Sequence, residues 1–230
     1  MKLLGIETST YSLSVAIVDD DNVLGELSLN IGPKHSERLI PIIDWLLKEV
    51  GMERKEIEGI AVSIGPGSFT SLRVGISAAK GLAFSLGIPV VGVSSLDVLA
   101  GNVLFSSITV CTLIDAKKKE VFAAFFRSSG KFINRISEDV VVSPQALCDM
   151  VHEKTIFIGD GAVTYRDLLE SNLGGLAFFC PPSFNLPRAS NCVFVGATRL
   201  KNERGDDLST LAPRYLRKAE AEIYKEGVIR

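Results

Sequence analysis

The segment SIGPGSFTSLRVG, residues 63–75, has the composition of a phosphate-binding loop, because two glycines and several hydroxyls precede a helical stretch. A Walker loop that starts at Gly65 would need Gly and Lys where Thr70 and Ser71 stand, and a dinucleotide fingerprint would need a third glycine at Thr70. Both kinds of phosphate loop are therefore excluded. The segment is predicted to join a strand to a helix that Ser68 or Thr70 caps.

A second hydroxyl-rich segment, ETSTYS at residues 7–12, follows the first apolar run. Turn N–H groups and the oxygens of Ser and Thr can together bind a phosphate. The same residues are common in ordinary polar hairpin turns. The segment alone does not decide between these two interpretations.

The other chemistry-bearing residues do not form a recognisable catalytic set. The two histidines, His35 and His152, lie in different halves of the chain and form no HxxxH or HExxH pair, so no histidine-based metal site is expected. A Ser-His-Asp triad stays open, although no GxSxG elbow is present. The carboxylates of Glu7, Asp97 and Asp115 cannot be paired from sequence. We predict no catalytic residue and no metal ligand.

Composition indicates a globular protein with no basic excess. The 230 residues are 47% hydrophobic, and the net charge is −2. Nucleic-acid binding depends mainly on lysine and arginine side chains that neutralise phosphates. The one dense basic run, Lys117 to Lys119, lies between two apolar runs and is interpreted as a solvated turn. We therefore expect no direct binding of nucleic acid by this chain alone.

Cysteine usage and hydropathy indicate a cytoplasmic protein without a membrane segment. The N-terminus turns polar after six residues, which is too short for a signal peptide, and no run approaches the roughly 18 apolar residues of a membrane helix. The cysteines form no CxxC pair, which is typical of reduced, packed thiols. They are Cys111, Cys148, Cys180 and Cys192.

Apolar periodicity in the first hundred residues predicts three strands followed by alternating helices and strands. The three strands are separated by tight turns, which implies an antiparallel meander. The predicted strands are Lys2–Glu7, Ser12–Val18, Val23–Leu29, Ile60–Ile64 and Pro89–Val93, and the predicted helices are Ser36–Val50, Thr70–Leu86 and Ser94–Ala100.

The second half repeats this order without repeating the sequence. The order βββαβαβα therefore occurs twice, with a boundary near residues 101–107, which predicts an α/β protein with helices packed on central sheets. The predicted strands are Ile108–Asp115, Val121–Arg127, Phe132–Val141, Thr155–Ile158 and Leu176–Cys180, and the predicted helices are Pro144–Val151, Tyr165–Ser171 and Asn191–Lys201.

Small residues recur every four positions, at Gly75, Ala79 and Ala83, on the helix after the glycine-containing loop. This stripe can pack against the protein's own sheet or admit a helix of another chain. Trp45, the only tryptophan, is equally compatible with a core position and with an interface. The wide apolar face of the preceding helix favours an interface with another chain.

Five segments of the chain resemble the TsaB family, also called YeaZ, of tRNA threonylcarbamoyladenosine biosynthesis proteins. The resemblance is close over the first hundred residues, thins between residues 105 and 205, and returns at residues 213–219. The segments are IETST, KHSERLIP, IGPGSFTSLRVGISAAKGLA, IPVVGVSSLD and APRYLRKAEA.

The resemblance implies the fold of the actin, Hsp70 and sugar-kinase (ASKHA) superfamily, with two βββαβαβα subdomains. We expect an N-terminal subdomain at residues 1–104 that carries partner-binding helices, a C-terminal subdomain at residues 105–212, and a tail at residues 213–230. The order of elements derived above from periodicity agrees with this fold.

The resemblance also implies a comparison with the larger paralogue, TsaD, which transfers threonylcarbamoyl to adenosine 37 of tRNA. TsaD carries metal-binding histidines where this chain has Ser95 and Leu99. A hydroxyl is a poor ligand for a transition metal, and leucine has no lone pair. The resemblance therefore implies a non-catalytic subunit that binds and activates a TsaD homologue.

Family likeness implies further that the helices Ser36–Val50 and Leu72–Leu86 form the pairing surface, and a homodimer when the partner is absent. A TsaE-type ATPase is the implied third member, and tRNA is reached only through the complex. The expected contact residues are Leu39, Ile43, Trp45, Leu46, Arg73, Ile76, Ala79, Lys80 and Ala83.

A vestigial nucleotide site is expected at positions that match the phosphate and adenosine motifs of the superfamily. The second phosphate motif, at Asp115, lacks its glycines, so close approach of the backbone to a phosphate is not expected there. No cofactor is expected on this chain alone, and weak ATP or ADP binding is expected at the partner interface. The residues of the vestigial site are Glu7, Thr8, Ser9, Thr10, Gly159, Asp160 and Gly161.

Two other functions remain as alternatives. One is an enzyme that acts alone, either an ATP-dependent phosphotransferase or an M22-type metallopeptidase. The absent glycines after Asp115 disfavour the phosphotransferase, and the absent histidines disfavour the peptidase. The other is a plain nucleotide-binding module that contributes residues to a shared site.

Overall fold

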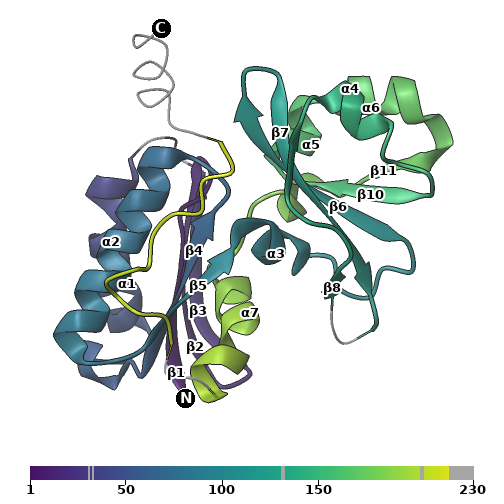
Figure 1. The fold of residues 1–230 in the computed structure, drawn as a ribbon. Helices are drawn as coiled ribbons and strands as arrows, with labels where there is room; N and C mark the ends of the chain where they lie inside the picture. Colours follow the sequence, from purple (N-terminus) through teal and green to yellow (C-terminus); the bar gives the residue numbers. More distant parts are fainter. Residues whose placement is uncertain (31, 33, 131–132, 203–204, 218–230) are drawn as a thin grey trace, which may run out of the picture.

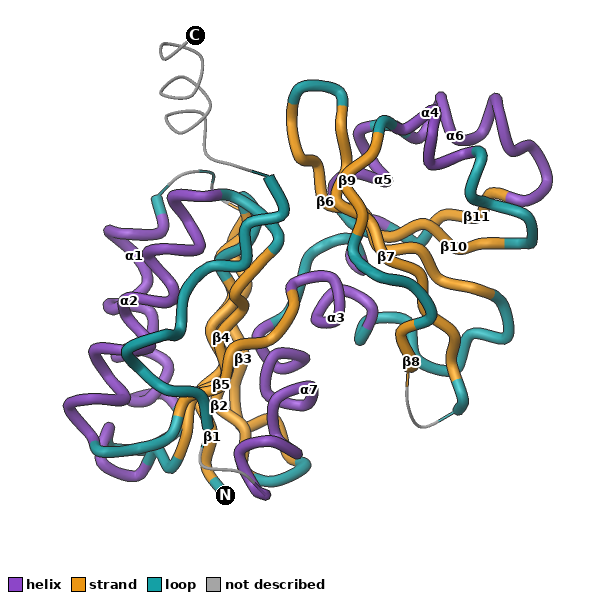
Figure 2. Tube along the Cα trace, in the orientation of Figure 1, coloured by secondary structure: helices purple, strands orange, loops and turns teal. Residues whose placement is uncertain are grey.

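The computed structural model describes residues 1–30, 32, 34–130, 133–202 and 205–217. These residues form two mixed β-sheets with helices packed on them (Figures 1 and 2). The predicted α/β class is thereby confirmed. Of the predicted tail, residues 218–230 lie outside the described residues.

The first sheet has five strands in the order β3-β2-β1-β4-β5. The first three strands are antiparallel neighbours, and β4 joins β1 and β5 in parallel. The predicted meander followed by parallel strands is therefore present. The strands are β1 (Lys2–Glu7), β2 (Ser12–Asp19), β3 (Asn22–Asn30), β4 (Gly59–Gly65) and β5 (Val90–Ser94).

Helices cover both faces of the first sheet (Figure 1). α1 (His35–Glu49) and α2 (Phe69–Leu86) pack on one face, where strand residues such as Leu4 and Ile6 are buried. α7 (Ala189–Asn202) packs on the other face, against alternate strand residues such as Leu3. Successive side chains of a strand point to opposite faces, so two covered faces require apolar residues at nearly every strand position.

The second sheet has the order β11-β10-β6-β7-β8, and β9 also pairs with β7. α4, α5 and α6 pack on one face of it, while α3 lies on the other face, between the two sheets (Figure 2). Its strands are β6 (Thr109–Lys117), β7 (Glu120–Ser128), β8 (Ile133–Arg135), β9 (Val140–Val142), β10 (Thr155–Ile158) and β11 (Ala177–Phe179). The remaining helices are α3 (Ser95–Ala100), α4 (Pro144–Cys148), α5 (Asp160–Thr164) and α6 (Arg166–Leu173), with short 3-10 turns η1 (Arg54–Glu56), η2 (Gly174–Leu176) and η3 (Pro182–Phe184).

Two elements of the second half differ from the prediction. The strand predicted from Phe132 to Val141 is two short strands, β8 and β9, and Phe132 itself lies outside the described residues. The Ser137 Oγ accepts the Phe125 backbone N–H at 2.8 Å, so a side chain replaces a backbone partner there and interrupts the ladder. The helix α5 was not predicted, because its GDG start reads as a turn.

The predicted boundary at residues 101–107 separates the strands of the two sheets, but α7 returns to the first one. Its buried residues, including Ala189 and Val193, complete the core under β1, β4 and β5. The expected C-terminal subdomain, residues 105–212, therefore contains one helix, α7, that packs on the first sheet. Among the helices in the described part of the chain, none is long and apolar enough to cross a membrane.

Residues 205–217, which follow α7, contain no helix or strand but include a turn at residues 208–210, and we call this segment the strap. The strap begins beside β5, where the Asp206 N–H donates to the Val90 carbonyl at 2.7 Å. It then crosses α2, whose Lys80 Nζ donates to the Leu211 carbonyl at 3.1 Å. At its far end Arg214 pairs with Asp139 at 3.0 Å. The strap thus connects the first sheet to the second.

Candidate functional site

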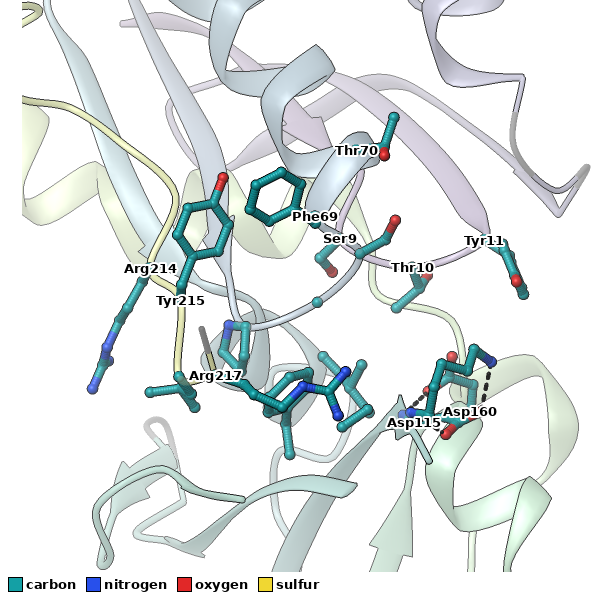
Figure 3. A pocket seen from close by; sticks show the side chains of 18 of the residues that line it. Ser9, Thr10, Tyr11, Phe69, Thr70, Asp115, Asp160, Arg214, Tyr215 and Arg217 are labelled. Atoms are coloured by element: carbon teal, nitrogen blue, oxygen red, sulfur yellow. Dashed lines mark hydrogen bonds and ion pairs between the residues drawn. The ribbon is translucent and has the colours of Figure 1, made fainter. Parts of the chain in front are cut away.

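A cleft of about 530 Å³ lies between the two sheets. Figure 3 shows the turn after β1, with Ser9, Thr10 and Tyr11, on one wall, and Asp115 and Asp160 of the second half on another. The N-terminus of α2 and the end of the strap complete the lining. The lining contains Ser9, Thr10, Tyr11, residues 66–70, residues 114–118, Phe122, Asp160 and residues 214–217.

The loop that joins β4 to α2 forms the base of this cleft. Ser68 caps α2, because its Oγ accepts the Ser71 N–H, and the capping prediction is confirmed. The Ser68 N–H donates to the Ser9 carbonyl at 2.7 Å, and a Cβ at Gly67 would lie 2.2 Å from that same oxygen. Only glycine permits this approach. Gly67 therefore allows the loop between β4 and α2 to pack closely against the turn after β1.

The hydroxyl groups of Thr8, Ser9 and Thr10, in the turn after β1, are either buried or bonded within the turn. Thr10 Oγ1 lies 2.9 Å from Ser12 Oγ and also accepts the Ser12 N–H. Thr8 Oγ1 and Ser9 Oγ are buried and have no hydrogen-bond partner among the described residues. A Cβ at Gly75 would lie 2.2 Å from Thr8 Oγ1, so α2 seals this side of the turn.

Glu7 is fully buried behind the turn and does not line the cleft. Its Oε1 accepts the Ser9 N–H at 2.6 Å, and the Cys192 Sγ lies 3.8 Å from Oε2. Burial raises the pKa of the Glu7 carboxyl, because the charged form loses its hydration there. The residue holds the turn in place from inside the first half.

We expect Glu7→Gln to stabilise the chain at alkaline pH relative to wild type. A carboxyl whose pKa is raised by folding stabilises the protein below its unfolded pKa, near 4.5, and loses that contribution as pH rises through the folded value. Glutamine keeps the acceptor for Ser9 and carries no charge. The difference in the free energy of unfolding, measured with urea between pH 4 and pH 9, should grow with pH. A constant difference would contradict this account of Glu7.

On the second sheet, Asp115 organises the turn between β6 and β7. Its carboxylate accepts the Lys117 backbone N–H at 2.8 Å and pairs with the Lys117 Nζ at 2.6 Å (Figure 3). Its own N–H donates to Asp160 Oδ1 at 2.9 Å. Burial raises the pKa of Asp160. The aspartate that matches a phosphate motif in the superfamily is thus engaged in a local turn.

The glycines on either side of Asp160 have a packing function. A Cβ at Gly159 would lie 2.0 Å from the Leu113 carbonyl oxygen, and one at Gly161 would lie 3.0 Å from the Leu113 side chain. Gly159 also has φ 115°, a conformation that favours glycine. These two residues therefore let α5 approach β6 closely, and Asp160 alone of the three lines the cleft.

The end of the strap forms an aromatic and cationic cluster at the cleft. The Tyr215 ring stacks on Phe69 with 4.6 Å between centroids, and the Arg73 guanidinium lies 3.8 Å from the centroid of the Phe69 ring (Figure 3 shows the two rings). Arg73 Nε donates to the Tyr215 hydroxyl at 2.9 Å. The family resemblance assigned Arg73 to a partner surface. The role of the tail from residue 213, which contains Tyr215, was left open.

The two positions at which the TsaD comparison places metal-binding histidines lie in the core of this chain. Ser95 and Leu99 are fully buried, and Leu99 packs among apolar side chains of the second sheet. Asp97 between them pairs with Arg135 at 2.8 Å. This donor set does not fit a transition metal. Within the described residues, no group of three or more His, Cys, Asp or Glu is arranged to hold a metal ion.

The side chains of six of the nine expected contact residues lie in the chain's own core. The stripe on α2 faces the sheet, so its small residues serve internal packing. Of the other three, Trp45 is 49% exposed, Arg73 is exposed and Lys80 is half-buried. The contact surface itself stays a prediction. The six buried residues are Leu39, Ile43, Leu46, Ile76, Ala79 and Ala83.

Sequence reasoning missed Phe84, which is 82% exposed on α2, and Ile40, which is 42% exposed on α1. Both lie on the outer side of the two helices, which pack beside one another on the same face of the first sheet (Figure 1). Phe84 follows Ser77 and Gly81 at helical spacing, and all three are exposed. The signal in the sequence was a phenylalanine at helical spacing from two small residues, Ser77 and Gly81.

Comparison with known proteins gives a consistent set of relatives. A sequence model described as TsaD, tRNA N6-adenosine threonylcarbamoyltransferase, matches residues 30–225. The tRNA threonylcarbamoyladenosine biosynthesis protein TsaB of Bacillus subtilis is 32% identical over 225 residues, which cover 96% of each chain. TsaB of Haemophilus influenzae is 32% identical, and the match covers 76% of this chain and 78% of that protein.

Solved structures agree in fold. YeaZ from Pseudomonas aeruginosa superposes with a TM-score of 0.79 and 26% identity, covering 94% of this chain and 99% of that one. The activator of 2-hydroxyisocaproyl-CoA dehydratase from Clostridium difficile, solved with ADPNP, gives a TM-score of 0.50 at 9% identity over 90% of this chain and 100% of that one. The second likeness concerns the fold alone, which is the two-subdomain ASKHA-like fold expected from the sequence.

Proposed function

The chain belongs to the TsaB family of tRNA threonylcarbamoyladenosine biosynthesis proteins, and from this premise we propose that it is the non-catalytic partner of a TsaD homologue. Family membership supports a role in the threonylcarbamoyladenosine modification of tRNA. In the proposed complex, the TsaD homologue performs the transfer to adenosine 37, and this chain activates it by dimerising with it.

The observation that carries the proposal is the outer surface of α1 and α2. Ile40, Trp45 and Phe84 expose large apolar side chains there, on two neighbouring helices. Large aromatic side chains are enriched among the residues that dominate protein interfaces. We define the outer helical surface by Ile40, Trp45, Ser77, Gly81 and Phe84.

The same surface pairs two copies of the chain when no partner is present. A TsaE-type ATPase joins as the third member of the assembly, and weak ATP or ADP binding occurs at the partner interface. The donor set at Ser95 and Leu99 is consistent with a subunit that carries no metal chemistry of its own.

The test is reconstituted threonylcarbamoyl transfer to tRNA with a TsaD homologue and a TsaE-type ATPase, with and without this chain. Transfer should require the chain, and the chain alone should turn over no ATP. A heterodimer should form on mixing with the TsaD homologue. Full transfer in the absence of the chain would refute the proposal.

A further inference from the structure

The chain passes between its two sheets at residues 101–108 and again at residues 180–188. We call the first sheet with α1, α2 and α7 the first lobe, and the second sheet with α4, α5 and α6 the second lobe. The two connections lie together, because Asn102 Nδ2 donates to the carbonyls of Phe184 and Leu186 at 2.7 and 2.9 Å. Neighbouring connections of this kind can act as a hinge, so the angle between the lobes depends on contacts made elsewhere.

The strap is fastened to the first lobe along its length. The Leu211 side chain is buried in the core that α2 shares with the first sheet. The Arg214 N–H donates to the Ile64 carbonyl at 2.6 Å, and the Tyr215 ring stacks on Phe69 of α2. A backbone hydrogen bond, a buried leucine and a stacked ring hold the strap in place. The strap therefore moves with the first lobe.

Three side chains at the end of the strap contact the second lobe instead. Leu216 packs against the apolar cluster on the face of the second sheet that α3 covers. Arg214 pairs with Asp139, just before β9, and Arg217 pairs with Glu120, the first residue of β7, each at 3.0 Å. β6 begins directly after one connection and ends at the hairpin that leads to Glu120. The contact at Glu120 therefore lies at the end of the second sheet that is far from the hinge.

The two ion pairs can break without unfolding either lobe. The side chains of Arg214 and Arg217 are 45% and 30% exposed, and exposed ion pairs contribute little to stability. The Asp139 side chain is buried, but its carboxylate also pairs with Arg135 of the second sheet. Release of Arg214 therefore leaves no unpaired buried charge, which would be costly. The strap is held firmly by the first lobe and loosely by the second.

We propose that the end of the strap is a latch that sets the opening of the cleft. With the latch closed, residues 214–217 line the cleft, as in this structure. When Arg214 and Arg217 release the second lobe, the strap stays on the first lobe and the second lobe turns away about the two connections. The cleft then widens between Ser9 on one wall and Asp160 on the other (Figure 3). This inference concerns the chain itself and does not depend on the proposed complex.

The decisive variant is Arg214→Gln combined with Arg217→Gln, which removes both ion pairs and leaves the backbone of the strap unchanged. Double electron–electron resonance between spin labels at Ser36→Cys and Ser171→Cys, both exposed and in different lobes, measures the separation of the lobes. The half-buried Cys180 is replaced by serine, and an excess of unlabelled chain suppresses distances between copies. The glutamine variant should show a longer distance whose population is about tenfold that in the wild type, because two ion pairs are lost.

The matched control is Arg54→Gln combined with Arg166→Gln, which removes the same charge and two other exposed ion pairs. Arg54 pairs with Asp44 inside the first lobe, and Arg166 pairs with Glu170 inside the second, so neither pair joins the lobes. The distances in this control should match the wild type.

A second control, Arg214→Lys combined with Arg217→Lys, keeps both charges of the latch. Its distances should also match the wild type.

Hydrogen exchange measured by mass spectrometry distinguishes release of the latch from detachment of the whole strap. The backbone N–H groups of residues 206 and 214 donate to the Val90 and Ile64 carbonyls, both in the first sheet. They should stay as protected in the glutamine variant as in the wild type. Three results would overturn the inference: no longer distance in the glutamine variant, an equal change in the Arg54 and Arg166 control, or faster exchange at residues 206 and 214.

A variant of the second lobe keeps the test valid if the glutamine variant does not fold. Glu120→Gln breaks the pair with Arg217 and leaves the strap itself unchanged. It should also raise the population of the longer distance, and unchanged distances in a folded Glu120→Gln chain would overturn the latch.

Discussion

A glutamate in place of Phe84 should strongly weaken the complex with a TsaD homologue while the chain itself stays folded. Phe84 is 82% exposed on α2, so the substitution removes no internal contact. Residues that dominate an interface contribute about 2–4 kcal/mol each. A charge at such a position should therefore raise the Kd about 30-fold to 1000-fold.

The measurement is the Kd of the heterodimer by isothermal titration calorimetry, with the Tm of the isolated chain as the test of folding. Phe105→Glu is the matched control, since Phe105 is 74% exposed in the loop after α3, away from the outer helical surface. The control should bind like wild type. A Phe84→Glu variant that still binds and activates the TsaD homologue would show that the partner uses a different surface.

A glutamate at Ala79, only five residues earlier on the same helix, should instead unfold the chain. Ala79 is fully buried in the core between α2 and the first sheet. Burial of an unpaired carboxylate costs about 4 kcal/mol or more, even after the group shifts its pKa. For a domain of this size the Tm should fall by about 10 °C or more.

Differential scanning calorimetry of the Ala79→Glu variant tests this, with Ser77→Glu as the folding control on the exposed side of α2. Ser77→Glu should change the Tm by less than about 2 °C, as surface substitutions do. Loss of partner binding by Ala79→Glu would then report unfolding rather than a contact. An unchanged Tm would contradict the buried position of Ala79.

The contrast between these two residues shows how far the sequence predicts which side of α2 faces the core. Periodicity predicted α2 as Thr70–Leu86, and the helix runs from Phe69 to Leu86. The side that faces inward could not be decided, because both sides carry small residues: Gly75 and Ala79 inside, and Ser77 and Gly81 outside. The inward side is set by contacts such as that of Gly75 with Thr8, which are distant in the sequence.

The cleft was predictable in its parts but not in its assembly. Of the residues expected in a vestigial nucleotide site, Ser9, Thr10 and Asp160 line the cleft, whereas Glu7, Thr8, Gly159 and Gly161 do not. Nucleotide binding itself stays a prediction. The strap could not be predicted, because its contacts with α2 join residues 131 and 142 positions apart and leave no local pattern. The solvated turn predicted at Lys117 to Lys119 is present, and all three lysines are exposed. Its left-handed backbone could not be predicted, because it depends on the hairpin and on Asp115.

The return of α7 to the first sheet has a consequence for biosynthesis. One face of β1, β4 and β5 is covered only when residues 189–202 arrive, after the whole second sheet has been translated. Until then a nascent chain leaves the side chains of Leu3, Ala61 and Val91 exposed to solvent. Such uncovered apolar strands are where chaperones bind and where aggregation begins. The strands of the first sheet are thus translated first, but the core on this face of the sheet is completed only when α7 has been translated.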